Sequence, residues 1–220
     1  MKNIKVIIFD AYGTLFDVNS AAEKCKDKIG DKWEPFADFW RTTQLEYTWL
    51  RSLMGRHKDF WQITEDSLDK SLKVYKIDSS LKGELLNLYK TLSPYEEVLN
   101  VLNTLKKKNF KLAILSNGTP SLLSELVKNN DLNNLFDDLF SIEQVEVYKP
   151  DFKVYDMPIK KYKIKKNEVA FLSANTWDVS GGGNYGYQAI WVNRNSNIFD
   201  NLDYKPRFEI KDLYGLLNKF

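Results

Sequence analysis

The chain has 220 residues, enough for one domain or for one core that carries a modest insertion. It holds 32 basic and 30 acidic residues, a net charge of +2, and 43% of its residues are hydrophobic, as in ordinary globular proteins. This balance argues against disorder, and the spread of lysines between acidic residues argues against the concentrated positive field of a nucleic-acid-binding surface.

The sequence also argues against disulfides, secretion and membrane insertion. Cys25 is the only cysteine, so the chain forms no internal disulfide and no zinc site built on cysteine pairs. The apolar run Val6–Phe9 is too short for a signal-peptide core, and no stretch reaches the roughly 18 apolar residues that span a bilayer. We therefore expect a cytoplasmic protein with no membrane partner.

Short apolar runs mark the strands of the predicted fold. Four runs do not alternate apolar and polar residues over their whole length, which is typical of parallel strands covered by helices on both faces. They are Ile4–Phe9, Phe110–Leu115, Val169–Leu172 and Ala189–Val192, and a weaker run is Asp138–Ile142. Helical patterns such as Val98–Leu105 lie between runs. This order predicts an α/β fold with a doubly wound, Rossmann-like core and a mainly parallel sheet.

The interval between the first two strands is too long for a simple crossover. About 100 residues separate Asp10 from Phe110, whereas a strand–helix–strand unit needs about 30 in all. Apolar residues in this interval recur at spacings of three and four, as in helices. We predict an inserted all-helical cap over residues 18–93, and a core formed by residues 1–17 and 94–220. A cap over the carboxyl edge of the sheet would enclose a small-molecule site.

Polar residues follow the ends of several predicted strands. Asp10 ends the first strand, residues 116–119 and 173–178 follow two others, and Lys149 stands in a loop before a proline. Each residue alone has an ordinary explanation, such as capping a turn. Because the carboxyl ends of parallel strands meet at one edge of a sheet, the set together predicts a functional site at that edge.

These segments resemble those of the haloacid dehalogenase superfamily, and most closely its L-2-haloacid dehalogenases. The superfamily pattern is an Asp nucleophile after the first strand, a Ser or Thr after the second, then a Lys and an acidic cluster. The matching segments are FDAYGTLFDV at 9–18, QLEYTWLRSLMGRHKDF at 44–60, LSNG at 115–118, VYKPDFKVY at 147–155, FLSANTWD at 171–178 and AIWVNR at 189–194. They span nearly the whole chain, including the cap.

The resemblance implies a catalytic set around Asp10. Asp10 would be the nucleophile, and Lys149 would keep it ionised, since a nearby cation lowers the pKa of a carboxylate. The residues that would orient the nucleophile or activate water are Thr14, Asn175 and Asp178, and those that would support Lys149 are Ser173 and Tyr155. Arg41 and Ser116 complete the implied catalytic set.

The resemblance also implies how substrate and halide bind. Arg41 would reach from the cap to the departing halide, because a planar cation with several N–H donors suits an anion. The substrate carboxylate would meet Ser116 and backbone N–H groups of the turn after Asp10. The implied binding residues are Ala11, Tyr12, Arg41, Leu45, Phe60, Ser116, Asn117 and Trp177, of which Tyr12, Leu45 and Phe60 would surround the alkyl group.

Tyr12 separates a dehalogenase from a phosphatase within this superfamily. The phosphatases carry a second Asp two residues after the nucleophile, because a departing alkoxide needs a proton from a general acid. Here that position is Tyr12, and a halide leaves without a proton. The last motif has only Asn175 and Asp178, a poor set for the oxygen ligands that Mg²⁺ prefers. We therefore predict catalysis without a metal or another cofactor.

The predicted reaction has two steps. Asp10 attacks C2 of an L-2-haloalkanoic acid from behind the halogen, which yields an ester and a free halide. Water then attacks the carbonyl carbon of the ester and releases the 2-hydroxy acid. A single inversion at C2 predicts the D-2-hydroxy acid as product.

Two alternatives stay open at this point. A Mg²⁺-dependent phosphatase of the same superfamily is disfavoured by Tyr12. A non-catalytic binding module is disfavoured because Asp10, Arg41, Lys149 and Asp178 are all present. The resemblance also implies a homodimer, for which the cap tryptophans Trp33, Trp40, Trp49 and Trp61 could supply an interface.

Three features depart from the family pattern or lie outside it. Thr42 stands where close relatives often carry a longer residue, so pocket size or access would differ. The glycine-rich run at 181–186 fits the letters of a dinucleotide fingerprint, but it does not follow directly on a strand, and close packing explains it better. His57, the only histidine, is expected on the surface of the cap.

Overall fold

A six-stranded, wholly parallel sheet forms the centre of the computed structural model, which describes residues 1 and 3–220. The strand order is β3-β2-β1-β4-β5-β6, and each neighbouring pair runs parallel. The strands are β1 (Val6–Phe9), β2 (Lys111–Ser116), β3 (Asp138–Ser141), β4 (Val169–Ser173), β5 (Gln188–Val192) and β6 (Phe208–Ile210). The predicted doubly wound α/β fold is confirmed, and β6 is a strand that the sequence patterns did not indicate.

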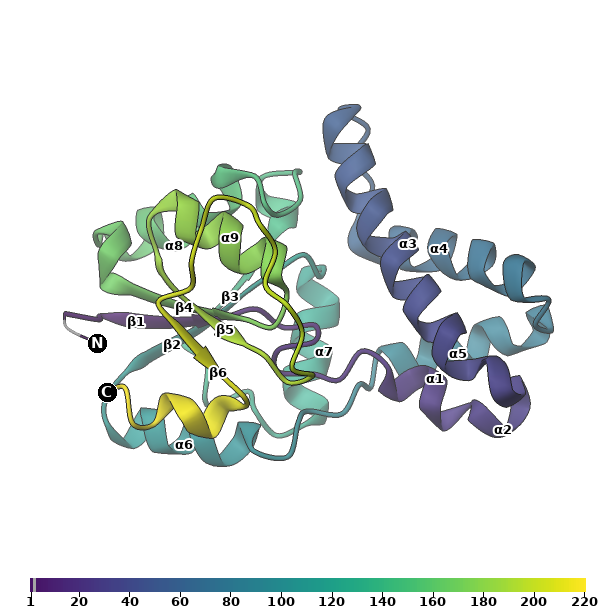
Figure 1. The fold of residues 1–220 in the computed structure, drawn as a ribbon, viewed down its shortest axis with the longest axis horizontal. Helices are drawn as coiled ribbons and strands as arrows, with labels where there is room; N and C mark the ends of the chain where they lie inside the picture. Colours follow the sequence, from purple (N-terminus) through teal and green to yellow (C-terminus); the bar gives the residue numbers. More distant parts are fainter. Residues whose placement is uncertain (2) are drawn as a thin grey trace.

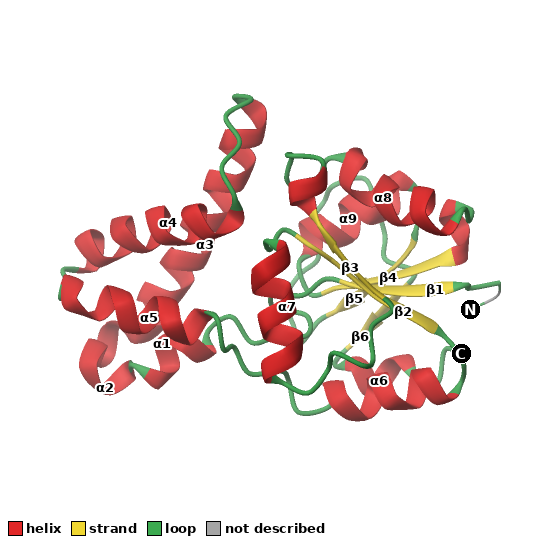
Figure 2. Cartoon of the chain, turned by 180° about the vertical axis from the view of Figure 1, so that it is seen from behind, coloured by secondary structure: helices red, strands yellow, loops and turns green. Residues whose placement is uncertain are grey.

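Helices cover both faces of this sheet. The core helices are α6 (Val98–Lys107), α7 (Pro120–Asn129), α8 (Phe152–Tyr162) and α9 (Thr176–Tyr185). Helices α8 and α9 lie on one face and α6 on the other (Figures 1 and 2). This arrangement explains why the central strands carry continuous apolar runs, since every residue of β1 and β4 is buried. Short 3-10 helices occupy Gly30–Lys32, Ser79–Leu81, Ile142–Gln144, Lys166–Glu168 and Leu213–Leu216.

The inserted helices form a separate group beside the sheet. They are α1 (Ser20–Lys24), α2 (Lys26–Ile29), α3 (Trp33–Leu53), α4 (Phe60–Tyr75) and α5 (Lys82–Tyr89). Figure 1 shows them on one side of the sheet, with the long α3 crossing and contacting α4. We retain residues 18–93 as the proposed extent of this cap.

Two linkers join the cap to the core, and they lie against each other. The N–H of Asp17 donates to the carbonyl of Ser93 at 2.9 Å, and the N–H of Tyr95 donates to the carbonyl of Leu15 at 3.0 Å. The first linker continues directly from the turn after β1. The position of the cap is therefore coupled to the loop that carries Asp10.

Close packing explains the glycines of α9. A Cβ atom added at Gly181 would lie 2.6 Å from the Tyr155 hydroxyl oxygen and from Pro150 Cβ, and one added at Gly182 would lie 2.7 Å from Phe171. These glycines let α9 approach α8 and β4. Among the helices within residues 1 and 3–220, none combines the length and the apolar character needed to cross a bilayer.

Candidate active site

The carboxylate of Asp10 lies at the carboxyl edge of the sheet, where β1 turns toward the cap. Its Oδ2 accepts hydrogen bonds from Thr14 Oγ1 at 3.0 Å, from Asn175 Nδ2 at 2.9 Å and, at 3.4 Å, from Ser173 Oγ. Its Oδ1 accepts from Lys149 Nζ at 3.0 Å. The side chain is only 7% exposed, so protein groups rather than bulk water hold both oxygens.

Lys149 connects Asp10 to a second carboxylate. Its Nζ lies 3.0 Å from Asp10 Oδ1 and 2.8 Å from Asp178 Oδ2, and its side chain is 1% exposed. Burial opposes the charged ammonium, but the two carboxylates outweigh this effect and raise the pKa of Lys149. The lysine is therefore a buried, protonated counter-charge shared by two acids.

Asp178 lies in the first turn of α9 and is fully buried. Burial raises the pKa of Asp178 to about 6; the charge of Lys149 opposes the rise and that of Asp10 adds to it. The Tyr155 hydroxyl donates to Asp178 Oδ1 at 2.7 Å. Burial raises the pKa of Tyr155 well above its ordinary value, so this hydroxyl remains a donor. An acid with a pKa near 6 in a dry pocket suits proton transfer near neutral pH.

Hydrogen bonds link the loops after β1 and β4. Thr14 Oγ1 donates to Asp10 and accepts from the N–H of Ala174 at 2.8 Å. Asn175 Nδ2 donates to Asp10 and also to the carbonyl of Tyr12 at 3.2 Å. The N–H of Asn175 donates to Ser173 Oγ at 3.1 Å. Each polar residue thus has a defined orientation toward the Asp10 carboxylate.

The loop after β2 approaches the same edge, but within the described chain no hydrogen bond joins it to Asp10. Asn117 Oδ1 accepts from the N–H of Lys149 at 3.2 Å, so this loop positions the backbone of the lysine. Ser116 Oγ accepts from the N–H of Gly118 at 3.1 Å. A Cβ atom at Gly118 would lie 2.9 Å from the ring and hydroxyl of Tyr12, so any larger residue here would displace the Tyr12 ring.

Aromatic residues of the cap cover the turn after Asp10. The ring of Tyr12 is stacked on Tyr89, with centroids 5.7 Å apart, and lies 5.2 Å from the ring of Phe60. Burial raises the pKa of Tyr12 well above its ordinary value, so the phenol remains neutral. The Tyr12 hydroxyl is buried without a hydrogen-bond partner among the described residues.

Arg41 lies on α3, half-buried in the cap, and its Nη1 donates to Gln44 Oε1 at 2.8 Å. The described contacts do not join Arg41 to Asn117 or Trp177. Trp177 instead packs edge-to-face on Trp49 of α3, with centroids 5.4 Å apart. The structure therefore leaves the implied halide-binding residues on both sides of the seam between cap and core.

The structure assembles some of the predicted residues and leaves others apart. Those joined by hydrogen bonds or ion pairs are Asp10, Thr14, Lys149, Tyr155, Ser173, Asn175 and Asp178. Ser116 and Leu45 lie at the end of β2 and on α3, without a direct contact to this cluster in the described chain. Among the cap residues that contact predicted site residues, Gln44, Trp49 and Tyr89 were not predicted as part of the site. Gln44 lies three positions after Arg41, a helical spacing that could have indicated it.

His57 is not the simple surface residue that we expected. Its Nε2 lies 2.9 Å from Glu143 Oε2 of the core, and its ring packs on Tyr148 with centroids 5.5 Å apart. The Tyr148 hydroxyl donates to the carbonyl of Lys58 at 2.6 Å. The chain folds back from α3 into α4 at this loop. The contacts attach the loop to the one that carries Lys149.

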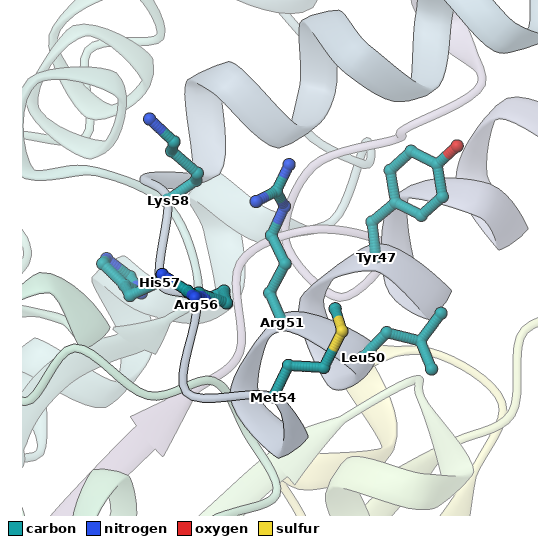
Figure 3. Close-up of a pocket in the computed structure, with 7 residues that line it drawn as sticks. All are labelled: Tyr47, Leu50, Arg51, Met54, Arg56, His57 and Lys58. Atoms are coloured by element: carbon teal, nitrogen blue, oxygen red, sulfur yellow. The ribbon is translucent and has the colours of Figure 1, made fainter.

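A groove of about 520 Å³ lies at the same end of α3 (Figure 3). Its lining side chains come from the last turns of α3 and the following loop: Tyr47, Leu50, Arg51, Met54, Arg56, His57 and Lys58. None of the predicted site residues lines it. The groove is therefore a feature separate from the Asp10 cluster.

The donor set around Asp10 does not fit a Mg²⁺ site. Within the described residues, no group of three or more His, Cys, Asp or Glu side chains is placed to hold a metal ion. The two acids present, Asp10 and Asp178, both direct an oxygen at the ammonium of Lys149. Mg²⁺ prefers about six oxygen ligands in octahedral geometry, whereas an ammonium is satisfied by two carboxylates and few other contacts.

The chain is similar to known hydrolases over most of its length. The family model described as haloacid dehalogenase-like hydrolase matches residues 4–186. An (S)-2-haloacid dehalogenase of Pseudomonas fluorescens is 39% identical over 220 residues, which cover 99% of this chain and 97% of that protein. An (S)-2-haloacid dehalogenase of Pseudomonas putida is 38% identical, with the same coverage.

Solved structures agree with this relationship. An L-2-haloacid dehalogenase from Xanthobacter autotrophicus with chloropropionic acid covalently bound has a TM-score of 0.91 and 32% identity, over 98% of this chain and 97% of that chain. A crystal structure of a dehalogenase has a TM-score of 0.98 and 34% identity, over 100% of this chain and 98% of that chain. The chain belongs to the haloacid dehalogenase-like hydrolases and, within them, to the (S)-2-haloacid dehalogenase family.

Proposed function

We propose that the protein hydrolyses small L-2-haloalkanoic acids to D-2-hydroxy acids without a metal or another cofactor. The observation that carries the proposal is the ammonium of Lys149 between the carboxylates of Asp10 and Asp178. It gives a nucleophile and a base a common counter-charge. Tyr12 occupies the position where a phosphatase would need a general acid, which fits a leaving group that departs as an anion.

The hydrogen bonds of Asp10 support distinct roles for its two oxygens. Among the described residues Lys149 is the one donor to Oδ1, and we assign this oxygen the attack on C2. The C2–halogen bond breaks as the C2–Oδ1 bond forms, and the halide leaves with the bonding electrons. Oδ2 accepts from Thr14 and Asn175, and more weakly from Ser173. These donors would stabilise the negative charge that develops on this oxygen during ester hydrolysis.

Asp178 is the proposed base for the second step. It takes a proton from the water that attacks Cγ of the ester, and the tetrahedral intermediate then breaks its Cγ–Oδ1 bond. The product alkoxide takes up the remaining proton of that water, which leaves Asp10 ionised again, and Asp178 then releases its proton to solvent. Each turnover therefore consumes one water and releases one halide and one proton. Tyr155 and Lys149 hold the two oxygens of Asp178 in place for this transfer.

The binding roles of the other residues are also part of the proposal. Arg41, Asn117 and Trp177 would bind the halide after the cap moves against the core. Ser116 and the N–H groups of Ala11 and Tyr12 would bind the substrate carboxylate. The contact between the tilted rings of Tyr12 and Phe60 supports a role in enclosing the alkyl group, with Leu45 on α3.

Chloride release from the separate enantiomers of 2-chloropropionate, with EDTA present, tests the reaction. We expect release from the L-form alone and D-lactate as product. Release that requires added Mg²⁺, or turnover of phosphate esters in place of haloacids, would contradict the proposal.

We further propose a cytoplasmic homodimer with no nucleic-acid partner. The buried free thiol of Cys25 suits a reducing compartment. Trp40 is buried within the cap, and Trp33, Trp49 and Trp61 are partly buried. These tryptophans therefore offer little exposed surface for a dimer interface, and we propose a different face. Leu50, Leu53 and Met54 at the end of α3 are 51%, 84% and 63% exposed and offer an apolar face. Light scattering of the wild-type protein and of Leu53→Glu tests this state, because an interface at this face would be lost in the variant.

A further inference from the structure

Arg41 is a half-buried cation without an anionic partner in the described chain. None of the ion pairs formed by described residues includes it, and its one hydrogen-bond acceptor is the neutral amide oxygen of Gln44. The other two half-buried arginines each have an anionic partner. Arg51, on the same helix, lies 3.1 Å from Asp66 Oδ2, and Arg194 lies 2.8 Å from Glu97 Oε1. The charge of Arg41 is therefore left uncompensated inside the cap.

Gln44 is buried, and its orientation is determined by its neighbours. Its Nε2 donates to Thr64 Oγ1 at 2.7 Å and to the Tyr89 hydroxyl at 3.1 Å. The Thr64 hydroxyl proton is already used, because Thr64 Oγ1 donates to the carbonyl of Phe60 at 2.7 Å. Thr64 can therefore only accept from Gln44, which requires the NH₂ group on that side and the amide oxygen on the side of Arg41.

This network joins three cap helices at the surface that faces Asp10. Gln44 lies on α3, Thr64 on α4 and Tyr89 on α5. The ring of Tyr89 is stacked on Tyr12, two residues after the nucleophile. The positive charge of Arg41 and the negative charge of Asp10 have opposite effects on the pKa of Tyr89, which burial raises overall. Arg41 and Asp10 thus both lie close enough to the Tyr12 and Tyr89 rings for their charges to act on the two phenols.

We propose that Gln44 is a positioning residue that holds the guanidinium of Arg41 with an uncharged acceptor, so that the cation keeps its charge for the departing halide. A carboxylate at this position would accept the same hydrogen bond, but it would form a buried ion pair and compete with the halide for Arg41. The inference rests on the proposed dehalogenase function. It adds a residue that acts through Arg41 and does not touch the substrate.

The test compares Gln44→Glu with Gln44→Ala. If Gln44 acts through its charge state, Gln44→Glu weakens halide binding more; if it acts only through packing, Gln44→Ala does. Gln44→Glu keeps the shape of the side chain and adds a charge, whereas Gln44→Ala removes both the shape and the acceptor. Gln62→Glu is the matched control. Gln62 lies on α4, its amide donates to Asp66 at 3.0 Å, and no hydrogen bond among the described residues joins it to Arg41. All four proteins are assayed for turnover of L-2-bromopropionate, inhibition by added bromide and thermal unfolding.

We expect the inhibition constant for bromide to rise about tenfold or more in Gln44→Glu, because the added carboxylate offsets the cation. It should rise less in Gln44→Ala and stay near the wild-type value in Gln62→Glu. An unchanged inhibition constant in Gln44→Glu, or a larger effect in Gln44→Ala, would overturn the inference. If Gln44→Glu does not fold, the inhibition constant of Gln44→Ala for bromide tests the inference. An unchanged constant in Gln44→Ala would exclude a role for Gln44. Absence of turnover by the wild-type protein would instead contradict the proposed function.

Discussion

The ammonium of Lys149 lies 3.0 Å from the Asp10 carboxylate, and these two side chains are only 1% and 7% exposed. Asp178, fully buried, lies on the other side of the same ammonium at 2.8 Å. Two acids therefore share one cation in a site with little water. Removal of the cation would leave like charges together, which a protein interior does not tolerate without protonating an acid or opening the structure.

Lys149→Met tests this dependence. We expect chloride release to fall by about 100- to 1000-fold, the range typical of losing a preorganised electrostatic contact. We also expect the free energy of unfolding to fall by about 3 to 5 kcal/mol, because the variant buries unpaired carboxylates. Urea unfolding and a chloride assay measure the two effects.

Lys153→Met is the matched control, since Lys153 is exposed on α8 and should tolerate the change. Adding Asp178→Asn to Lys149→Met should recover part of the lost stability without recovering activity. A Lys149→Met protein as stable as the wild type would show that the cation is not needed to hold the two acids.

The pH dependence of turnover follows from Asp178. Burial raises the pKa of Asp178 to about 6 in the free protein, with part of the rise caused by the charge of Asp10. In the ester intermediate Asp10 is neutral, so the pKa of Asp178 should fall. Since the proposed base acts in its ionised form, kcat should be lost only as the pH drops through a value below 6. The raised pKa of Lys149 keeps the counter-charge in place on the alkaline side.

Measurement of kcat between pH 4 and 9, with halide release as the readout, checks this profile. An NMR titration of the free protein should place Asp178 at a higher pKa than the kcat profile does. A kcat profile that falls at a pH above the pKa of free Asp178 would contradict the assignment of Asp178 as the base.

Sequence patterns predict the edge of the sheet better than they predict the cap. Buried parallel strands carry continuous apolar runs, and the polar residues that follow them meet at one edge, so Asp10 and the segment after β4 that holds Asp178 were accessible to prediction. Lys149 does not follow a strand directly, since β3 ends at Ser141 and a 3-10 helix intervenes, and its role was predicted from the family resemblance. Strand β6 was missed because it has three residues and lies at the edge of the sheet, with only Ile210 buried. Tyr89 was missed because its contact with Tyr12 depends on how α5 packs against the core, and no sequence spacing expresses that packing.

Gly181 is predicted to be required for the Tyr155–Asp178 hydrogen bond. A methyl group at this position would lie 2.6 Å from the Tyr155 hydroxyl oxygen, so Gly181→Ala must displace the tyrosine or α9. We expect a stability loss of about 1 to 3 kcal/mol from overpacking, together with slower ester hydrolysis. Rapid-quench detection of the ester would show its accumulation.

Gly83→Ala is the matched control for this substitution. Gly83 lies in α5 with no atom within 4 Å of an added Cβ. Alanine there should stabilise the helix by about 0.5 to 1 kcal/mol. Equal stabilities and ester lifetimes for the two variants would refute the steric argument.

Arg194 contacts the turn that follows Asp10. Its Nη2 donates to the carbonyl of Thr14 and lies against Glu97 Oε1, both at 2.8 Å, and its guanidinium lies 3.6 Å from the centroid of the Tyr95 ring. Lysine is a point charge without a planar fork, so it cannot reproduce the stacking and the two contacts together. We expect Arg194→Lys to lower stability by about 1 to 3 kcal/mol, the cost of leaving buried partners unsatisfied. Turnover should also fall, because Thr14 donates to Asp10.

Thermal unfolding and chloride release measure the effect of Arg194→Lys. The matched control is Arg207→Lys, at an exposed position. Two indistinguishable variants would show that the Thr14 carbonyl needs no such support.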